Sequence, residues 1–468
     1  MSLNQSQDVF HAQKDKVKHG GPKLKIIAPC AVGNGILKLK PATQAYYEER
    51  FHEILAPLCF FIPASGSGSR MFDFLQVELA LGEPELATKT KEFIDQLKDF
   101  AFYKALNPEQ KQRIATLHSH SELINFILKD DESGIGLGKL PKGLVPFHSY
   151  EEGQSSAFIE HLRQGTAVSE KLVNFHFTIQ NSHQEAFKEA LSNFKSGHQS
   201  KSEVGFSFQD HETDSFVFDE HQEPLMTAHN TYLRRPSGHG ALLGNLNALK
   251  EQFILIKNID NVQHGDQAKA GILIWRVLCG ILHTVKCQLK DLKDNADHTK
   301  LKAVGAEFDL FSPEELEAAK DEGFLKKLIN RPIRICGMVL NEGKAGGGPF
   351  HIDFDGIRSK QIVEGVQVTG AEQQQVFNSS THFNPVMMAM DTCDLEGEKI
   401  DLTKFSNDEQ YFVVRKNFEG QEVTFIERPG LWNGSMFSWN TIFIEIPPET
   451  FTPVKTVLDL LKPAHQPH

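Results

Sequence analysis

The sequence predicts an α/β fold, a three-layer sandwich whose central sheet is mostly parallel and Rossmann-like. Strand-like runs alternate with helical runs over most of the chain, which is the pattern of such a sandwich. The apolar run Leu58–Pro63 leads directly into a loop of small residues, and α/β sheets place their ligands at such strand ends. The composition is globular, with 40% apolar and 24% charged residues, so we expect a large core.

A helical insertion is predicted after the small-residue loop, at about residues 77–138. Apolar residues at helical spacing predict one helix over 85–106. Asn107 followed by Pro108 is typical of a helix cap with proline at the first helical position, so a second helix should run from there to about residue 128. A loop rich in glycine and acidic residues, 130–138, closes the insertion.

The alternation of strands and helices then resumes and continues to the C-terminal region. Each segment is assigned from its apolar periodicity and from the turn residues that bound it. Strands are predicted at 172–179, 204–208, 215–219, 253–259, 334–340, 361–368 and 441–446, and helices at 155–163, 183–194, 241–252, 267–289 and 455–461.

Charge and cysteine content exclude several classes of function. The 49 basic and 61 acidic side chains give a net charge of -12, which argues against nucleic acid or an anionic membrane as the main partner. The N-terminus lacks the apolar run of a secretory signal, and no stretch approaches the roughly 18–20 apolar residues that span a bilayer. The six cysteines are scattered without a C-x-x-C pair, so we expect a reduced, cytoplasmic protein.

The loop at 64–71 is the first candidate for chemistry. Gly66 and Gly68 would let the backbone approach a phosphate, and consecutive N–H groups before a helix make an anion site. Ser65 and Ser67 lie between the glycines, and Arg70 adds a fixed positive charge suited to phosphate oxygens. The alternative is a tight strand-to-helix turn without a ligand.

Two further segments carry candidate phosphate or base contacts. Lys142 follows Pro141 near the start of a strand, where it could point back at the loop 64–71 or remain a surface lysine. In the turn 236–240, Gly238 and Gly240 flank His239 before a predicted helix, so backbone amides could meet a base edge or a phosphate. The alternative for this turn is a flexible connection and a helix cap.

An aspartate at a strand end is the candidate metal ligand. Asp260 follows the buried strand 253–259, where a carboxylate is costly unless it is paired or bound to metal. Carboxylate and phosphate oxygens are the ligands that Mg²⁺ prefers. The alternative is an aspartate that caps the next turn.

Three weaker candidates come from the C-terminal third of the chain. Glu364, on a predicted strand, could hydrogen-bond a sugar hydroxyl or face water, and Asn378 lies in a polar turn, 377–384. Lys455 begins the segment 455–461, which could equally be a terminal amphipathic helix.

The order of these segments resembles that of the uridylyltransferases that act on sugar 1-phosphates, especially the eukaryotic-type UDP-glucose and UDP-N-acetylhexosamine pyrophosphorylases. The matching pieces run from about residue 58 to 461 in the family's order. The chain is also similar to a bacterial family of this superfamily, a domain of unknown function. The pieces are Gly66-Ser-Gly68-Ser-Arg70-Met71, Pro141-Lys142, Pro236-Ser-Gly-His-Gly240, Asp260-Asn261, Val363-Glu364, Phe377-Asn378 and the run from Phe451 to Leu461.

The chain also departs from the family's pattern. About 70 residues separate the glycine loop from Pro141-Lys142, where the family has a short stretch. The turn after Phe377 reads Asn-Ser-Ser-Thr-His, so the part that would meet the sugar differs most.

The resemblance implies a nucleotide-diphospho-sugar transferase fold and a reaction. Residues 1–45 would be an N-terminal extension, and residues 46–468 a nucleotidyltransferase-like catalytic domain. A sugar 1-phosphate would attack the α-phosphate of a nucleoside triphosphate, with UTP as the implied nucleotide and Mg²⁺ as the cofactor. Roles carried over are catalytic for Arg70, Lys142 and Lys455, nucleotide-binding for Ser65, Gly66, Ser67, Gly68, Gly238, His239 and Gly240, sugar-binding for Glu364 and Asn378, and metal-binding for Asp260.

Two other functions remain open from the sequence. One is a nucleotide-sugar binding protein or glycosyltransferase on the same fold, without pyrophosphorylase activity. The other is a regulatory or structural protein that has lost the chemistry. The expected partners are small-molecule substrates, while the sequence does not indicate an oligomeric state.

Overall fold

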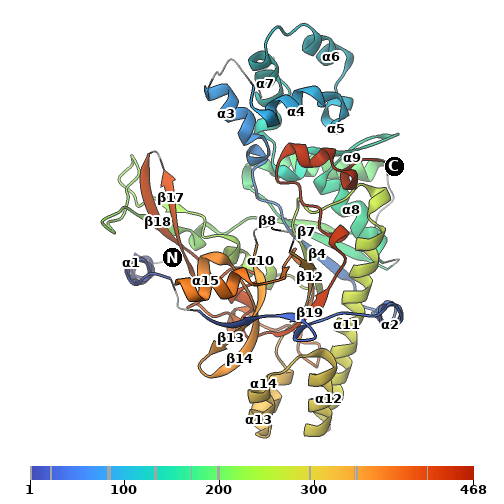
Figure 1. The fold of residues 1–468 in the computed structure, drawn as a ribbon, viewed down its shortest axis with the longest axis vertical. Helices are drawn as coiled ribbons and strands as arrows, with labels where there is room; N and C mark the ends of the chain where they lie inside the picture. Colours follow the sequence, from blue (N-terminus) through green and yellow to red (C-terminus); the bar gives the residue numbers. More distant parts are fainter. Residues whose placement is uncertain are drawn as a thin grey trace. The chain divides into compact units, whose positions relative to one another are not determined.

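The chain divides into two compact units in the computed structural model, whose elements are labelled in Figure 1. The first unit comprises Met1–Leu58, Gln209–Leu255 and Arg276–Ile446, and the second comprises Cys59–Phe208, Ile256–Trp275 and Pro447–His468. The structure describes residues 3–21, 24–81, 86–130, 134–169, 171–197, 201–294, 297–341, 343, 346–418 and 420–467. Two residues at the edges of expected elements, Glu85 and Ala345, lie outside the described residues.

The second unit is built on three neighbouring strands in the order β4-β7-β8. These are β4 (Leu58–Pro63), β7 (Val173–Thr178) and β8 (Val204–Ser207), and β7 and β8 pair in parallel. Phe60 of β4 stacks on Phe175 of β7, with ring centroids 5.6 Å apart. The unit also contains β5 (Pro146–Tyr150), β6 (Gly153–Ser156), α8 (Ala157–Val168) and α9 (Gln184–Gly197).

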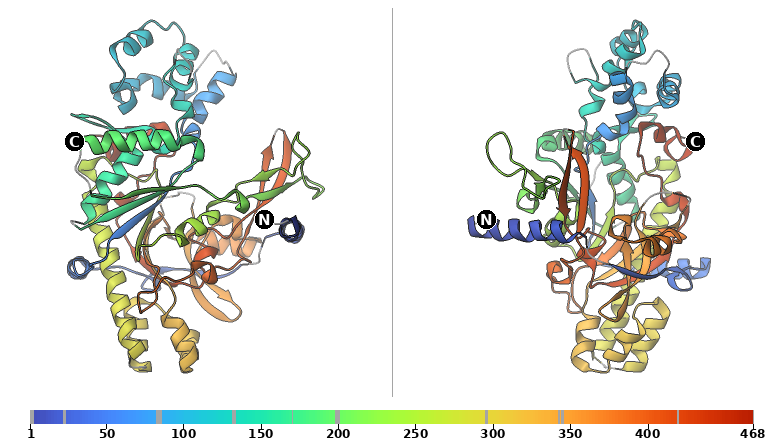
Figure 2. Two further views of the ribbon diagram at one scale, coloured as in Figure 1. Left: turned by 180° about the vertical axis from the view of Figure 1, so that it is seen from behind. Right: turned by 60° about the vertical axis from the view of Figure 1, so that its left-hand side comes forward.

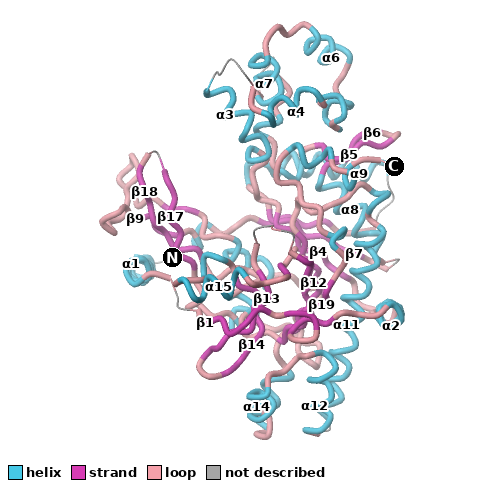
Figure 3. The backbone as a smooth tube through the Cα atoms, in the orientation of Figure 1, coloured by secondary structure: helices cyan, strands magenta, loops and turns pink. Residues whose placement is uncertain are grey.

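The segment between β4 and β5 is helical, as predicted, but its two long helices are broken into shorter ones (Figure 3). The expected helix cap at Asn107 is confirmed, because its side chain accepts from the backbone N–H of Gln110 and Pro108 begins the helix. The prediction of one helix over 85–106 is wrong, since Phe100 is extended and fully buried, and the helical turn stops there. The helices are α3 (Asp73–Leu81), α4 (Thr88–Asp95), α5 (Ala101–Lys104), α6 (Pro108–Ala115) and α7 (His120–Leu128).

The first unit contains five neighbouring strands of one sheet, in the order β2-β3-β19-β12-β16. The pairs β2–β3, β3–β19 and β19–β12 are parallel, and β16 runs antiparallel to β12. The prediction of a mixed α/β fold with a large, mostly parallel sheet is therefore confirmed, whereas its three-layer, Rossmann-like arrangement stays a prediction. The strands are β2 (Ala31–Val32), β3 (Gly35–Leu37), β12 (Ile333–Leu340), β15 (His382–Phe383), β16 (Met387–Asp391) and β19 (Asn440–Glu445), while β11 (Phe253–Lys257) contains the unit boundary.

Two smaller antiparallel sheets of the first unit were not predicted from the sequence. One has the order β1-β13-β14 and the other the order β10-β9-β18-β17. Helix α1 (Leu3–His19) packs on the second of these, with Phe10 against Phe216 and Phe218, and Figure 2 shows it from two sides. The strands are β1 (Lys25–Pro29), β13 (Gly348–Phe354), β14 (Ile357–Val363), β9 (Ser215–Phe218), β10 (Arg234–Arg235), β17 (Phe412–Phe418) and β18 (Gln421–Glu427).

Three predicted elements are shorter in the structure than expected, and one of them is a 3₁₀ turn. The helix expected at 241–252 is only α10 (Leu243–Asn247), and the helix expected at 455–461 is a 3₁₀ turn, Val457–Leu461. The strand expected over 361–368 ends at Val363 with β14, because the chain turns into the 3₁₀ segment Gly365–Gln367. The remaining helices are α2 (Pro41–Phe51), α11 (Lys269–Asp294), α12 (His298–Phe308), α13 (Pro313–Ala318), α14 (Glu322–Ile329) and α15 (Ala371–Asn378).

Helix α11 corrects the expectation that no segment is long and apolar enough to cross a membrane. Its stretch Lys269–Lys293 meets that criterion by length and composition. However, 61% of its apolar window is buried inside the fold, and core helices pass the same test. The helix therefore carries no membrane assignment.

Candidate functional site

The small-residue loop 64–71 is hydrogen-bonded to the segment that contains Lys142. The backbone N–H of Gly68 donates to the carbonyl of Leu140 at 3.1 Å, and that of Lys142 donates to the carbonyl of Gly66 at 3.2 Å. Ser67 and Pro141 form an isolated bridge between these hydrogen bonds. The long helical insertion therefore leaves and returns at one point, and the loop and Lys142 are neighbours as the sequence motifs suggest.

The two glycines of the loop are required for different reasons. A Cβ atom on Gly68 would lie 2.4 Å from the carbonyl oxygen of Leu140, so this glycine allows the loop to pack against its neighbour. A Cβ atom on Gly66 would meet nothing within 4 Å, and Gly66 is exposed. Packing within the protein therefore does not explain Gly66, whereas close approach of a ligand would.

Lys142, Asp260 and Lys455 form a three-membered ion cluster. Lys142 Nζ donates to Asp260 Oδ2 at 2.8 Å, and Lys455 Nζ donates to the same oxygen at 2.9 Å. The side chains of Lys142 and Asp260 are 14% and 9% exposed, whereas that of Lys455 is 63% exposed. Two positive charges thus converge on one buried carboxylate oxygen.

The backbone around Asp260 is fixed by the C-terminal segment. The carbonyl of Asp260 accepts from the backbone N–H of Val454 at 3.0 Å. The side chain of Asn261 accepts from the backbone N–H of Thr452 at 3.0 Å and donates to the carbonyl of Thr450. The Asp260-Asn261 pair at the end of β11 therefore holds the segment that delivers Lys455.

The cluster shifts the proton affinities of its members. Burial alone would raise the pKa of Asp260, but the ammonium groups of Lys142 and Lys455 outweigh it and hold this pKa below its usual value. Burial lowers the pKa of Lys142, and its attraction to Asp260 opposes that shift. The carboxylate is therefore firmly ionised at neutral pH.

A second buried lysine at the end of β11 escaped the sequence analysis. Lys257 is 4% exposed, and burial lowers its pKa to about 8. No hydrogen bond or ion pair among the described residues engages its ammonium group. His161, which also lines the small cavity beside Lys257, donates from Nε2 to the carbonyl of Ile259 at 3.2 Å. Burial, followed by the charge of Lys257, lowers the pKa of His161 to about 3. A single lysine at the end of an apolar strand is typical of an exposed position, so no sequence pattern indicated that Lys257 is buried.

Arg70 and the serines of the loop are placed at the surface. Arg70 is exposed within the 3₁₀ segment Ser69–Phe72, and none of the described carboxylates forms an ion pair with it. Ser67 Oγ donates to Ser69 Oγ at 2.8 Å, and the carbonyl of Ser65 accepts from Gln180 at 2.7 Å. Arg70 is thus available to an anion, but its contact with one stays a prediction.

In the first unit, His239 lies beside Glu364. His239 Nδ1 accepts from the backbone N–H of Leu431 at 2.8 Å, which leaves the proton of the neutral ring on Nε2. That Nε2 lies 3.5 Å from Glu364 Oε1, and the indole of Trp432 stacks on the imidazole with centroids 4.0 Å apart. The structure therefore brings together a predicted base-binding and a predicted sugar-binding residue.

The glycines that flank His239 have a packing role. Gly238 has a φ of +74°, which favours glycine, and a Cβ atom there would lie 2.6 Å from a carboxylate oxygen of Glu427. A Cβ atom on Gly240 would lie 2.1 Å from the carbonyl oxygen of Pro429. Tight packing of this turn explains both glycines without a ligand.

Asn378 is not hydrogen-bonded to His239 or Glu364 in the described part of the chain. It is the last residue of α15, so the polar turn expected from residue 377 starts only at Ser379. Its side chain accepts from Gln374 of the same helix at 3.3 Å. Within the described residues, no hydrogen bond joins it to Glu364, which caps the 3₁₀ turn after β14 instead of lying on a strand.

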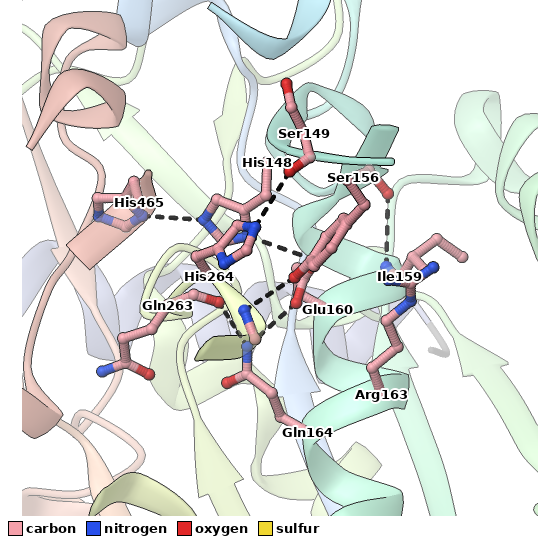
Figure 4. A network of polar contacts seen from close by, with 12 residues as sticks. His148, Ser149, Ser156, Ile159, Glu160, Arg163, Gln164, Gln263, His264 and His465 are labelled. Carbon is pink, nitrogen blue, oxygen red and sulfur yellow. Dashed lines mark hydrogen bonds and ion pairs between the residues drawn. The ribbon is translucent and has the colours of Figure 1, made fainter. Parts of the chain in front are cut away.

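A buried histidine network in the second unit was also missed (Figure 4). His148 Nε2 lies 3.0 Å from His465 Nδ1, and His148 Nδ1 lies 3.4 Å from Glu160 Oε1. His264 contacts the carbonyl of Ser149 at 3.0 Å. Burial lowers the pKa of His148 and lowers that of His465 to about 3, so both rings are neutral at pH 7. These residues are far apart in sequence, and only the fold reveals the network.

The described residues hold no group of three or more His, Cys, Asp or Glu side chains placed for a metal ion. Mg²⁺ at phosphate-handling sites is usually held by one or two carboxylates, and substrate phosphates and water complete its coordination. Asp260, a buried carboxylate beside the loop 64–71 and two lysines, has the donor chemistry for such a single-carboxylate site.

The fold and this cluster define a class: an α/β protein whose small-residue loop and paired lysines are suited to a phosphorylated ligand. The chain belongs to the family described as "Domain of unknown function (DUF4301)", which matches residues 2–466. No curated protein matches the chain.

The fold is shared with uridine diphosphate N-acetylglucosamine pyrophosphorylase from Trypanosoma brucei, solved in complex with an inhibitor. The two chains are 13% identical, the match covers 97% of this chain and 74% of that chain, and the TM-score is 0.51. A UDP-glucose phosphorylase from Trypanosoma brucei and a UDP-glucose pyrophosphorylase from Leishmania major are also similar, at 12% and 14% identity. The matches cover 98% and 97% of this chain and 75% and 74% of those chains, with TM-scores of 0.43 and 0.41.

Proposed function

We propose that this protein is a Mg²⁺-dependent nucleotidyltransferase that forms a nucleotide-sugar and pyrophosphate from a nucleoside triphosphate and a sugar 1-phosphate. The convergence of Lys142 and Lys455 on Asp260 is the observation that carries the proposal. Beside it lies the loop of Gly66, where a side chain would meet open space, so a phosphate could approach the backbone closely. The shared fold with a UDP-sugar pyrophosphorylase supports the same reaction class.

The reaction needs charge neutralisation more than proton transfer. An oxygen of the sugar 1-phosphate attacks the α-phosphorus, the bond from that phosphorus to the bridging β-phosphate oxygen breaks, and pyrophosphate leaves with the electron pair. Because the attacking oxygen is already anionic, no strong general base is required. Lys142 and Lys455 would bind the attacking and transferred phosphates, and positioned cations of this kind stabilise the charge that develops in the transition state.

The two lysines are suited to different parts of this task. Lys142 is largely buried and held by Asp260, so it offers a fixed charge. Lys455 is mostly exposed and can turn from Asp260 towards an arriving phosphate. Mg²⁺, when bound at Asp260, would supply further neutralisation of the triphosphate. The backbone amides of the loop 64–71 and Arg70 would hold the remaining phosphate oxygens.

We propose substrate-recognition roles for the remaining motif residues. The turn Gly238-His239-Gly240 would meet the base, and UTP is the expected nucleotide because of the motifs that the chain shares with uridylyltransferases. Glu364 and Asn378 would contact the sugar. We expect the protein to work in the cytoplasm, because its six scattered cysteines suit a reducing compartment.

Pyrophosphate release tests this function directly. The purified chain with Mg²⁺ is incubated with UTP, CTP, GTP, ATP or dTTP and a panel of sugar 1-phosphates. Release that requires both a nucleotide and a sugar 1-phosphate is the expected result, and the productive pair names the substrates. Silence across the panel from protein that binds a nucleotide contradicts the proposal.

A second candidate is a nucleotide-sugar binding protein or glycosyltransferase on the same fold. The end of α15 favours this candidate, because Asn378 lies on a helix and hydrogen-bonds within that helix. The segment assigned to sugar binding therefore differs from the polar turn expected by resemblance to the uridylyltransferases. Tight binding of a UDP-sugar without exchange of pyrophosphate into it would establish this alternative.

A further inference from the structure

A large cavity lies in the second unit, at the end of β7 and β8 that is remote from the loop 64–71. It is formed by the C-terminal halves of α8 and α9 and by the first residues of β7 and β8, which are labelled in Figure 1. The loop contacts the other end of β7, where the backbone N–H of Ala64 donates to the carbonyl of Thr178 at 2.8 Å. The cavity volume is about 770 Å³, within the roughly 300–1,000 Å³ of small-molecule sites. None of the described residues that line it belongs to the proposed nucleotidyl transfer site.

The walls of the cavity are largely apolar, and part of this apolar surface is exposed. Val173 and Phe175 of β7 are 1% and 2% exposed, so they form its deepest part. Leu172 is 42% exposed and lies at the rim, and Leu191 and Phe194 of α9 are half-buried. Because the removal of apolar surface from water is favourable, an apolar group that fills the cavity would gain affinity from its burial.

The charged residues that line the cavity are all cations. They are Arg163, Lys171, Lys195 and Lys201, and the described lining residues include no aspartate or glutamate. Arg163 pairs with Glu152 at 3.5 Å, whereas Lys195 and Lys201 are exposed and form no ion pair with any described residue. The whole chain has a net charge of -12, so this local group of cations departs from its average. An anionic group would be attracted to the cavity.

Helix stability accounts for only one of the two unpaired lysines. Lys195 lies in the last turn of α9, where a positive charge also stabilises the negative end of the helix. Lys201 lies between α9 and β8, outside the described helices and strands, so this explanation does not apply to it. The apolar walls disfavour a free sugar or inorganic phosphate, because neither offers apolar surface to bury. Apolar walls with cations at the rim match a ligand that has an apolar body and an anionic end.

We propose that this cavity binds an amphipathic anion, which is an alkyl or acyl chain that ends in a carboxylate or phosphate group. The chain packs against Val173, Phe175 and Leu191, and Lys195 and Lys201 attract the anionic end at the rim. The site does not depend on the proposed nucleotidyl transfer, and its failure would leave that proposal untouched.

Calorimetric titration of the full chain at low ionic strength tests the site with decanoate, decyl phosphate, decanol and hexanoate, each below the concentration at which it forms micelles. Leu172→Glu places a negative charge at the rim, and Leu81→Glu makes the same change at an exposed leucine of α3 as its matched control. Lys201→Gln removes one of the unpaired cations. Its control is Lys188→Gln, which changes an exposed lysine of α9 that does not line the cavity.

We expect saturable binding of decanoate or decyl phosphate, and the tighter of the two identifies the anionic group that the site takes. Decanol should bind at least about threefold more weakly because it lacks the charge, and hexanoate at least about tenfold more weakly because it lacks four methylene groups. Leu172→Glu should weaken the preferred anion at least about tenfold and Lys201→Gln about threefold, whereas Leu81→Glu and Lys188→Gln should bind it like the wild type. Absence of saturable binding by either ten-carbon anion, equal or tighter binding of decanol, or equal affinity in Leu172→Glu or Lys201→Gln would overturn the proposal.

Discussion

Lys142 Nζ donates to Asp260 Oδ2 at 2.8 Å, although the two residues lie 118 positions apart in the chain. Lys455 reaches the same oxygen from the C-terminal segment. Three of the sequence motifs thus meet at one oxygen atom. Removing one member of a buried ion pair leaves an uncompensated charge, whereas an exposed partner contributes little to stability. Measuring both the unfolding free energy and the turnover of each variant therefore distinguishes the structural role of a residue from its catalytic role.

Lys455→Met should reduce turnover while leaving the fold nearly unchanged. The Lys455 side chain is 63% exposed, so the loss of its ion pair should cost less than about 1 kcal/mol of unfolding free energy. Loss of a charged contact to phosphate, worth about 1.5–3 kcal/mol, should slow nucleotidyl transfer about 10- to 100-fold. Urea unfolding and pyrophosphate release measure the two effects. Normal turnover in the folded variant would remove Lys455 from the mechanism.

Asp260→Asn should abolish the Mg²⁺ dependence together with the activity. The amide cannot replace the carboxylate as a Mg²⁺ ligand of equal strength, and Lys142 loses its buried counter-charge. A Mg²⁺ titration of pyrophosphate release, with Asp130→Asn as an exposed control, checks this prediction. An unchanged titration in the folded Asp260→Asn variant would place the metal elsewhere.

Gly66→Ala and Gly68→Ala should behave oppositely. A methyl group on Gly66 meets open space, so unfolding free energy should stay within about 0.5 kcal/mol while turnover falls at least about tenfold. A methyl group on Gly68 collides with the carbonyl of Leu140 and should destabilise the protein by about 1–3 kcal/mol. Thermal unfolding and turnover of both variants give the comparison. Unaltered turnover in Gly66→Ala would mean that no ligand approaches this residue closely.

Acid should destabilise the protein through its buried histidines. The pKa of His161 is about 3 in the folded chain, against about 6.5 for an unfolded one. Between these values only the unfolded chain binds the proton, so the stability that His161 contributes is complete above pH 6.5 and is lost as the pH falls towards 3. The loss from this residue at pH 5 is about 2 kcal/mol.

Urea unfolding at pH 7 and pH 5 measures this loss. In His161→Asn the difference in stability between the two pH values should shrink by about 2 kcal/mol, whereas His118→Asn, which changes an exposed histidine, should leave it unaltered. The same pH difference in wild type and His161→Asn would show that His161 is not the buried titrating group.

The sequence was informative where short-range signals decide structure. The buried run Leu58–Pro63 forms β4 with the predicted bounds, and Asn107 caps its helix as expected. The ordered motifs led to Lys142, Asp260 and Lys455 before any geometry was known. Their contact depends on how the chain folds back after a long insertion, which local patterns do not encode.

Long-range packing explains what the sequence did not reveal. The glycine turn at His239 has the sequence pattern of a ligand-binding loop. However, its glycines allow close packing against Glu427 and Pro429, which lie nearly 190 positions later in the chain. The hairpin of β17 and β18 lacks clear alternation of apolar residues, so its strands were not predicted. Lys257 and the neighbours of His148 are distinguished from other polar residues only by burial, which is a property of the folded chain.

The most direct test of the central claim is pyrophosphate release by wild type, Lys142→Met and Lys139→Met with Mg²⁺, UTP and the best sugar 1-phosphate. Lys139 is exposed and lies three residues from Lys142, so it is the matched control. We predict release by wild type and by Lys139→Met, and a rate about 100-fold lower in folded Lys142→Met. Equal rates in Lys142→Met, or no release by folded wild type that binds UTP, would contradict the account.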